Sequence, residues 1–204
     1  MIEPASHFLV CQFTIKSFIS KNANEVEASK IYTIDRSGLV DLGIRDGILW
    51  ADRNIYAENV YDYGYYFSYD YLDGSLGPTN PVSAPLSIPK AEDSDRDNDF
   101  YNLKMDCDWK WTTNYNNSGK AGYIVYKKGG SNISEDPHIF LPAAGFTNGN
   151  GTTTPFTSPN GFYWSSTRKN SVSIYVLSFK EGEVRPYDDI DRSAGLPIRA
   201  VRRN

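Results

Sequence analysis

Ser165 and Ser166 are the residues whose surroundings best fit a catalytic nucleophile, because they follow two aromatic rings in the stretch GFYWSSTRKN. A serine hydrolase needs a base within hydrogen-bond distance of the hydroxyl, and a third group that orients the base. The only histidines are His7 and His138, and no G-x-S-x-G turn surrounds the serines. We therefore predict no catalytic site here. We expect Trp164 to lie in the core, with the small serines permitting close packing beside it.

The two cysteines, Cys11 and Cys107, have neither a C-x-x-C spacing nor histidines close to them in the sequence. A metal or redox motif is therefore not supported. Two buried thiols and one long-range disulfide are both compatible with the sequence.

The acidic run DSDRDND, residues 93–99, has the alternating carboxylates of a calcium-binding loop. An EF-hand loop needs glycine at its sixth position and glutamate at its twelfth, and here these are Asn98 and Lys104. We predict no calcium at Asp93, Asp95 and Asp97, and interpret the acids as the start of a helix. The glycine-rich stretches GGSN and GNGTTT do not continue as G-K-[ST], so a phosphate loop is unsupported. No metal and no cofactor is predicted.

Composition narrows the classes of function. The 204 residues fit one domain, or one domain with an extension, and carry a formal charge of −4. Basic residues cluster only at the end, in Arg199, Arg202 and Arg203, so nucleic acid is not expected as a partner. No apolar run approaches 18 residues, so no membrane span is predicted, and the first residues show no signal peptide. Fifteen tyrosines among many Gly, Asn and Ser are typical of loop-rich β proteins and of binding surfaces.

The elements predicted along the chain are many short strands and few helices. The best helix candidate is the segment 90–111, where Phe100, Leu103 and Cys107 are spaced i, i+3, i+7. The Asp46-Gly47 pair, followed by Ile48, Leu49 and Trp50, predicts a hairpin. Strands are expected in YIVYKK, HIFLPAAGF, SVSIYVLSF and LPIRAVRR, with a turn at Glu181-Gly182. This pattern predicts an α+β fold with long loops.

Four stretches together resemble the Fibrobacter succinogenes major paralogous domain family. They are VDLGIRDGILWADRNIYAENVYDYGYYFSYD, CDWKWTT, IFLPAAGF and GFYWSST…IYVLSF…GLPIRAVR, and they occur in this order from about residue 40 to residue 202. That family is similar to the C-type lectin-like fold. The C-terminal pattern also resembles the variable proteins of diversity-generating retroelements. The resemblance implies a C-type lectin-like domain over residues 37–204, after a β-rich N-terminal extension or attachment segment, residues 1–36.

The resemblance also divides the C-terminal part into a framework and a ligand-binding strip. The implied framework is Tyr163, Trp164, Ser165, Ser166, Gly195, Ile198, Arg199 and Val201. The implied ligand-binding residues are Arg168, Lys169, Asn170, Tyr175, Arg185, Tyr187, Asp188, Asp189, Asp191 and Arg192. The strip departs from the retroelement pattern, in which Asn, Tyr and Ser dominate, because it holds Lys, Glu, Arg and Asp. We expect one contiguous exposed face from residues 168–170 and 185–192.

Three functions are compatible with these residues. The first is a non-enzymatic recognition or adhesion protein on a cell surface, outside the cell or on a phage particle, with a protein or a glycan as its ligand. The strip mixes aromatic and charged residues, as recognition surfaces do, although solvated loops do so as well. The second is a structural subunit of a fibre, pilus or phage tail, in which the segment HFLVCQFTIKSFI, residues 7–19, pairs with a neighbour by strand addition, so homo-oligomers are possible. The third, an enzyme related to the formylglycine-generating branch of the fold, needs reactive cysteines and is the least supported.

Overall fold

The computed structural model describes residues 11–14, 31–34, 38–45, 47–72, 82, 84–92, 97–130, 136–148 and 159–203. The strands are β1 (Cys11–Thr14), β2 (Ile31–Ile34), β3 (Leu39–Asp41), β4 (Leu49–Ala51), β5 (Phe67–Ser68), β6 (Leu86–Ser87), β7 (Cys107–Thr112), β8 (Gly122–Lys127), β9 (His138–Pro142), β10 (Gly161–Arg168), β11 (Ser173–Lys180), β12 (Glu183–Asp191), β13 (Gly195–Leu196) and β14 (Val201–Arg202). The helices are α1 (Tyr69–Leu72), α2 (Asp99–Asp106) and a 3-10 turn at Tyr115–Asn117. This is a sheet-rich α+β architecture, as predicted from the sequence.

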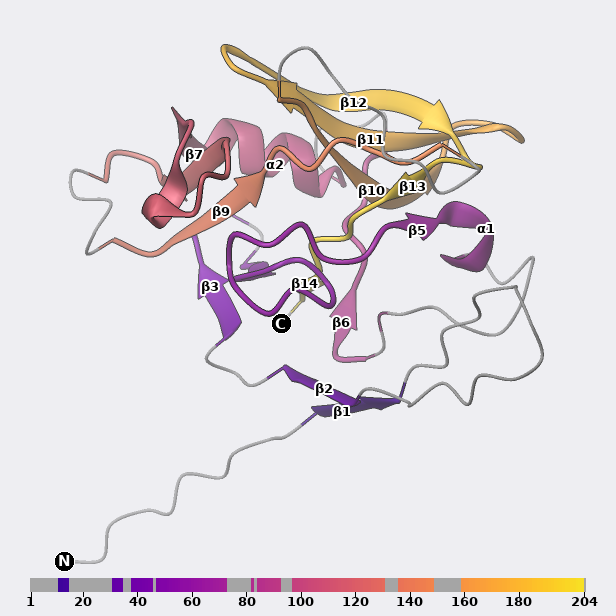
Figure 1. Ribbon diagram of the computed structural model, residues 1–204, viewed down its shortest axis with the longest axis horizontal. Coiled ribbons are helices and arrows are strands. Elements are labelled where there is room, and N and C mark those ends of the chain that lie inside the picture. The colour runs from indigo at the N-terminus through magenta and orange to yellow at the C-terminus, as the bar shows by residue number, and fades with distance from the viewer. Residues whose placement is uncertain are drawn as a thin grey trace, which may run out of the picture.

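The strands form small antiparallel sheets rather than one large one. Their orders are β1-β2, β10-β11-β12, β13-β5, β3-β4-β14-β6 and β7-β8-β9. The longest strands belong to β10-β11-β12, which is drawn as one layer with α2 and the β7-β8-β9 sheet on one side and β5 and β13 beneath it (Figure 1). Strand β14 lies between β4 and β6. It therefore joins the β3-β4 pair to β6 in one four-stranded sheet.

Strands β10 and β11 of the sheet β10-β11-β12 carry buried residues on both faces, whereas Pro186 is the one buried residue of β12. Successive residues of a strand point to opposite faces, and here Tyr163 belongs to one hydrophobic cluster and Trp164 to the other. The first cluster contains Leu177 and Phe179 together with residues of α2, and we call this face the α2 side. The second contains Trp164 and Val176 together with Phe67 of β5, and we call it the β5 side. Tyr163 and Trp164, which are consecutive residues of β10, therefore join the hydrophobic clusters on the two faces of the sheet to this strand.

The predicted hairpins and turns are present. Strand β3 pairs with β4 in antiparallel register, and Gly47 between them has a positive φ of 64°. Strand β11 pairs with β12, and Gly182 in their turn has a φ of 78°. Glycine adopts this conformation without the steric cost that a Cβ imposes, which explains why the two predictions from Asp46-Gly47 and Glu181-Gly182 were reliable.

The predicted helix is shorter than expected. Helix α2 begins at Asp99, where the side chain of the N-cap residue Asn98 accepts a hydrogen bond from the Tyr101 amide at 2.8 Å. It ends at Asp106, and Cys107 starts strand β7 instead of continuing the helix. The helix prediction was therefore wrong at residues 90–92, 97 and 98 and again from residue 107 onward. The alternating sequence CDWKWT favours a strand, in which the rings of Trp109 and Trp111 both pack on Tyr123 of β8.

Trp164 is fully buried, with an exposed fraction of 0%. Its indole Nε1 donates to the carbonyl of Phe67 at 2.6 Å, and its ring meets that of Tyr69 edge to face at 5.5 Å. Of the framework residues implied by the resemblance, Ser166 is exposed and all the others are buried.

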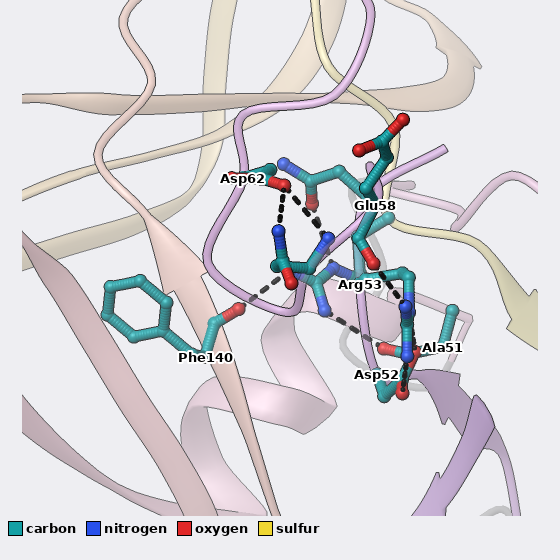
Figure 2. Close-up of polar contacts among 9 residues, drawn as sticks. Ala51, Asp52, Arg53, Glu58, Asp62 and Phe140 are labelled. Atoms are coloured by element: carbon teal, nitrogen blue, oxygen red, sulfur yellow. Dashed lines mark hydrogen bonds and ion pairs between the residues drawn. The ribbon is translucent and has the colours of Figure 1, made fainter. Parts of the chain in front are cut away.

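Arg199 is also fully buried, at 0% exposed, and bonds to three residues from two separate parts of the chain. Its guanidinium donates to the side-chain oxygen of Asn54 at 2.9 Å and to the carbonyls of Ala51 at 3.0 Å and Phe140 at 2.7 Å. Figure 2 labels two of these acceptors, Ala51 and Phe140, whose carbonyls each lie at the end of a dashed bond. Burial lowers the pKa of Arg199 from its ordinary value, although an arginine keeps its charge at neutral pH.

A second arginine holds the adjoining loop. Figure 2 shows Arg53 between the carboxylate of Asp52 and the backbone of Glu58. Its Nε donates to Asp52 at 2.9 Å, and its Nη1 donates to the Glu58 carbonyl at 2.6 Å. The carboxylate of Asp62 accepts from the amide and the side chain of Asn59. These bonds fix the loop that presents Asn54 to Arg199.

Replacing Trp164 with alanine is expected to reduce the free energy of unfolding by about 3–5 kcal/mol, because the large buried ring leaves a cavity. Denaturant titration of the two proteins measures this. Val172→Ala is the matched control, since that side chain is 57% exposed, and should change stability by about 0.5 kcal/mol or less. An unchanged melting curve for Trp164→Ala would contradict the burial of the ring.

Replacing Arg199 with methionine is expected to cost about 3 kcal/mol or more, because three buried acceptors lose their donor at about 1–3 kcal/mol each. The control is Arg202→Met, three residues later and only half-buried, which should cost much less. Equal stabilities for the two variants, measured by chemical denaturation, would show that the acceptors find other donors and that Arg199 does not hold the core.

Candidate functional site

The two serines of the YWSS motif are not placed for nucleophilic catalysis. Ser165 is fully buried, and its hydroxyl donates to the carbonyl of Tyr175 at 2.6 Å. Ser166 is exposed, and its hydroxyl lies 3.3 Å from the carbonyl of Pro89. His138 bonds instead to the hydroxyl of Tyr115, at 3.1 Å from Nε2. His7 lies outside the described residues. No serine–histidine pair therefore exists within the part of the chain that the structure describes.

Cys107 is a buried free thiol. Burial raises its pKa to about 12, and the nearby carboxylates of Asp106 and Asp108 act in the same direction. A thiolate is the reactive form of cysteine, so a raised pKa makes the residue inert. Cys107 forms no disulfide in the structure, and the side chain of Cys11 lies outside the described residues.

The predicted strip does not form one face, because a bulge in β12 separates its members. Ser178 pairs with Arg185, whereas Val176 pairs with Asp188. Two residues, Pro186 and Tyr187, therefore stand opposite the single residue Leu177. The bulge places Arg185 and Asp188 on the β5 side of the sheet, while Asp189 returns to the α2 side opposite Tyr175. The expectation of one contiguous exposed face was wrong for this reason.

The α2 side receives Tyr175, Tyr187 and Asp189, with Lys169 beside them. The ring of Tyr187 stacks on Tyr101 of α2, with centroids 5.6 Å apart. Lys169 forms an ion pair with Asp189 and lies over the ring of Tyr175 at 5.9 Å. The pair is partly exposed, so it contributes at most about 1 kcal/mol to stability. Asp191 extends this side at the end of β12, where bonds from Ser193 lower the pKa of its carboxyl.

The β5 side receives Arg185 and Asp188, which border a surface hollow of about 140 Å³. Ser178 and Phe162 lie in the same cross-strand row as Arg185, and they line the hollow with Asn160. The hydroxyl of Ser178 donates to the carboxylate of Asp188 at 2.6 Å. The end of β11 adds Lys180, which pairs with Glu183 at 3.1 Å.

The remaining strip residues lie near α1 or in a turn. The guanidinium of Arg168 lies 5.8 Å from the ring centre of Tyr69, and Arg192 forms an ion pair with Asp70. The side chain of Asn170 accepts from the amides of residues 172 and 173, both at 2.8 Å, and so closes the turn between β10 and β11. Arg192 and Asn170 therefore help to hold the scaffold together. The sequence analysis had instead assigned both residues to the ligand-binding strip.

Asn160, Phe162 and Ser178 are among the lining residues that sequence reasoning missed. A signal for Ser178 was present, because a small polar residue interrupts the apolar run SIYVLSF at a position that alternation places beside Val176 and Ile174. A serine in such a strand leaves space on its face and needs a hydrogen-bond partner there. The register of β10, β11 and β12 determines which residues surround that space. This register could not be predicted from the sequence.

Comparisons with protein-family models, with curated proteins and with solved structures gave no match to this chain. The described residues include no helix that is long and apolar enough to cross a membrane. Nor do they bring together three or more His, Cys, Asp or Glu side chains in a way that could hold a metal ion. Asp93 and Asp95 of the acidic run are outside the described residues, and Asp97 is exposed.

Cys107 is expected to resist alkylation by iodoacetamide at pH 8 in the folded protein, since burial raises its pKa to about 12. Peptide mass spectrometry measures the modified fraction. The same reaction in guanidinium is the control and should modify Cys107 fully. Rapid labelling of the native protein at this residue would reopen the hypothesis of an enzyme with a reactive cysteine.

Proposed function

We propose that this protein is a non-enzymatic recognition or adhesion module that binds a protein or a glycan through the exposed residues of the β10-β11-β12 sheet. The proposal includes a C-type lectin-like scaffold and a location on a cell surface, outside the cell or on a phage particle. Both of these rest on the resemblance of the sequence motifs. The sheet-rich α+β architecture is compatible with them.

The observation that carries the proposal is that this sheet separates buried residues, which form the core, from exposed residues, which are available for binding. Its interior positions are occupied by Tyr163, Trp164, Val176, Leu177 and Phe179, which are all buried. The strip residues at its outer strand and turns are exposed or half-buried, and they combine two tyrosines with charges of both signs. Tyrosine and arginine dominate the energy of many binding surfaces. Binding groups on such a supported sheet keep a fixed geometry without contributing much to folding.

The catalytic alternative lacks support from the described side chains. The buried thiol of Cys107 has a pKa raised to about 12, and the serine beside Trp164 is bonded inside the sheet. An enzyme of the formylglycine-generating type needs an activated cysteine. The groups that would have to react are thus held in unreactive states.

The alternative of a fibre or tail subunit requires an open strand edge. Strand β12 is an outer strand of its sheet, but it carries Pro186, which lacks an amide hydrogen, at its bulge. It also carries five charged side chains: Glu183, Arg185, Asp188, Asp189 and Asp191. Natural proteins use prolines, bulges and charges to block pairing at such edges. Strand addition at β12 is therefore disfavoured, and recognition through side chains is favoured at this sheet. The segment first considered for strand addition, residues 7–19, lies outside the described residues except for β1.

The test uses two sets of serine substitutions in the full chain. The first changes Lys169, Tyr187 and Asp189 on the α2 side, and the second changes Arg185 and Asp188 on the β5 side. Each set should cost no more than about 1 kcal/mol per position, because the residues are at least partly exposed. At least one set should abolish binding, measured on a glycan array and by pull-down against surface proteins.

Thermal melts accompany both measurements. Unfolding of both variants would assign these residues to the scaffold. Full binding by both variants would move the binding surface elsewhere, and the tyrosine-rich segment 61–71 would be the next candidate. A wild-type chain that binds neither glycans nor proteins would overturn the proposed function itself.

A further inference from the structure

The hollow on the β5 side of the sheet is built by two adjacent cross-strand rows. Phe162, Ser178 and Arg185 form one row, and Trp164, Val176 and Asp188 form the next. Ser178 lies between the large side chains of Phe162 and Arg185. Because its own side chain is small, it leaves a depression in the surface between them. The neighbouring row is closed by Trp164 and Val176, which are both fully buried. The hollow is therefore a consequence of one small residue in a supported sheet.

The charges around the hollow balance. Glu183 binds both cations, with contacts of 3.1 Å to Lys180 and 2.5 Å to Arg185. These bonds lower the pKa of Glu183, so it stays ionised and keeps neutralising the cations. Asp188 supplies the remaining negative charge at the rim. An anion entering the hollow would have to displace Glu183 from both cations and approach Asp188, so an uncharged ligand fits better.

Hydrogen-bonding capacity remains at the rim. A carboxylate offers about four acceptor positions, and Asp188 accepts from the Ser178 hydroxyl at 2.6 Å and the Asp189 amide at 3.0 Å. A guanidinium has five N–H donors, and Arg185 directs Nε and Nη2 to Glu183. A ligand with several hydroxyl groups can donate to Asp188 and accept from Arg185 at the same time. Phe162 adds an aromatic ring, which suits the C–H face of a sugar.

The size of the hollow limits the ligand. A protein cavity of about 150 Å³ admits benzene, and the hollow measures about 140 Å³. The hollow therefore admits part of one six-membered sugar ring, and the outward hydroxyl groups and the rest of a longer chain would extend into solvent.

We propose that the hollow bordered by Phe162, Ser178, Arg185 and Asp188 binds one neutral, polyhydroxylated pyranose ring, the terminal sugar of a glycan. This inference rests on the proposed recognition function and chooses the glycan among its two ligand classes. It also assigns the contact to the β5 side of the sheet rather than to Tyr187 and Lys169 on the α2 side.

The decisive comparison uses two neighbouring aspartates. Asp188→Asn removes the charged acceptor at the hollow and keeps the size of the side chain. Asp189→Asn makes the same change one residue later on the opposite face of the sheet. The probes are methyl glucoside, methyl galactoside and methyl mannoside, titrated into the full chain and followed by amide chemical shifts. Glucuronate and inorganic phosphate are titrated in parallel as anionic probes.

We expect at least one methyl hexoside to shift the amides of Phe162, Ser178, Arg185 and Asp188 in the wild-type chain. Asp188→Asn should weaken this binding by about tenfold, the loss expected for one hydrogen bond to a charged acceptor. Asp189→Asn should bind within about twofold of the wild type. Ser178→Leu, which fills the hollow, should abolish binding. Because Ser178 is buried, a melting curve accompanies that variant, and the comparison of the two aspartates stands without it.

The outcomes separate this inference from the proposed function. Equal affinities of Asp188→Asn and Asp189→Asn would overturn the hollow as a sugar site. So would stronger binding of glucuronate or phosphate than of every methyl hexoside, which would identify an anion site instead. If no hexoside binds at the hollow while the chain still captures a protein or a glycan through the α2 side, the recognition function stands and the hollow plays no part in it.

Discussion

The guanidinium of Arg199 is the interaction on which the arrangement of the sheets depends. It joins Ala51 at the end of β4, Asn54 in the following loop and Phe140 in β9, and it stands just before β14. A charge without a carboxylate in contact is costly to bury, and the hydrogen-bond acceptors of this one are neutral oxygens, with the charge of Asp52 adding a through-space attraction. Those oxygens must be in place together, so the bonds fix the relative positions of segments that lie far apart in the sequence.

The same polar centre reaches the long sheet through Tyr163. The Tyr163 hydroxyl donates to the Pro142 carbonyl at 2.9 Å, and the Asn54 amide, 3.4 Å away, joins it to the partner of Arg199. Burial raises the pKa of this tyrosine to about 12, so the hydroxyl stays protonated and continues to donate. Since Trp164 follows on the opposite face, strand β10 is held from both sides. The outer strand β12 and its turns remain as the part of the sheet whose side chains have least to do with the core.

Local signals in the sequence predicted the architecture well, because they concern neighbouring residues. The glycine turns, the alternating strands and the buried Trp164 all follow from backbone conformation or from hydrophobic pattern. The helix over residues 90–111 was only partly predictable, since Phe100 and Leu103 fit its period but the strand β7 is stabilised by pairing with β8. Such pairing is a tertiary effect that outweighs the local preference. The resemblance placed Arg199 in the framework, but the partners of its guanidinium could not be predicted, because its acceptors are distant in the sequence.

The candidate site shows the limit of period-two reasoning most clearly. In a regular strand Arg185, Tyr187 and Asp189 would share a face, since they are spaced i, i+2, i+4. The extra residue at Pro186 and Tyr187 breaks this alternation and brings Arg185 onto the face of Asp188 instead. A proline within a strand is a recognised sign of an edge or a bulge. Pro186 therefore indicated a bulge in this strand, but nothing in the sequence indicated how β12 pairs with β11 on either side of it. One bulge thus converts a continuous strip into two surfaces of different chemistry, an aromatic one packed on α2 and a charge-balanced hollow above Ser178.

Substitutions that shift the register at Pro186 would exchange the faces of Arg185 and Asp188 relative to the core. The bulge therefore constrains the binding residues as strictly as the buried arginine constrains the scaffold.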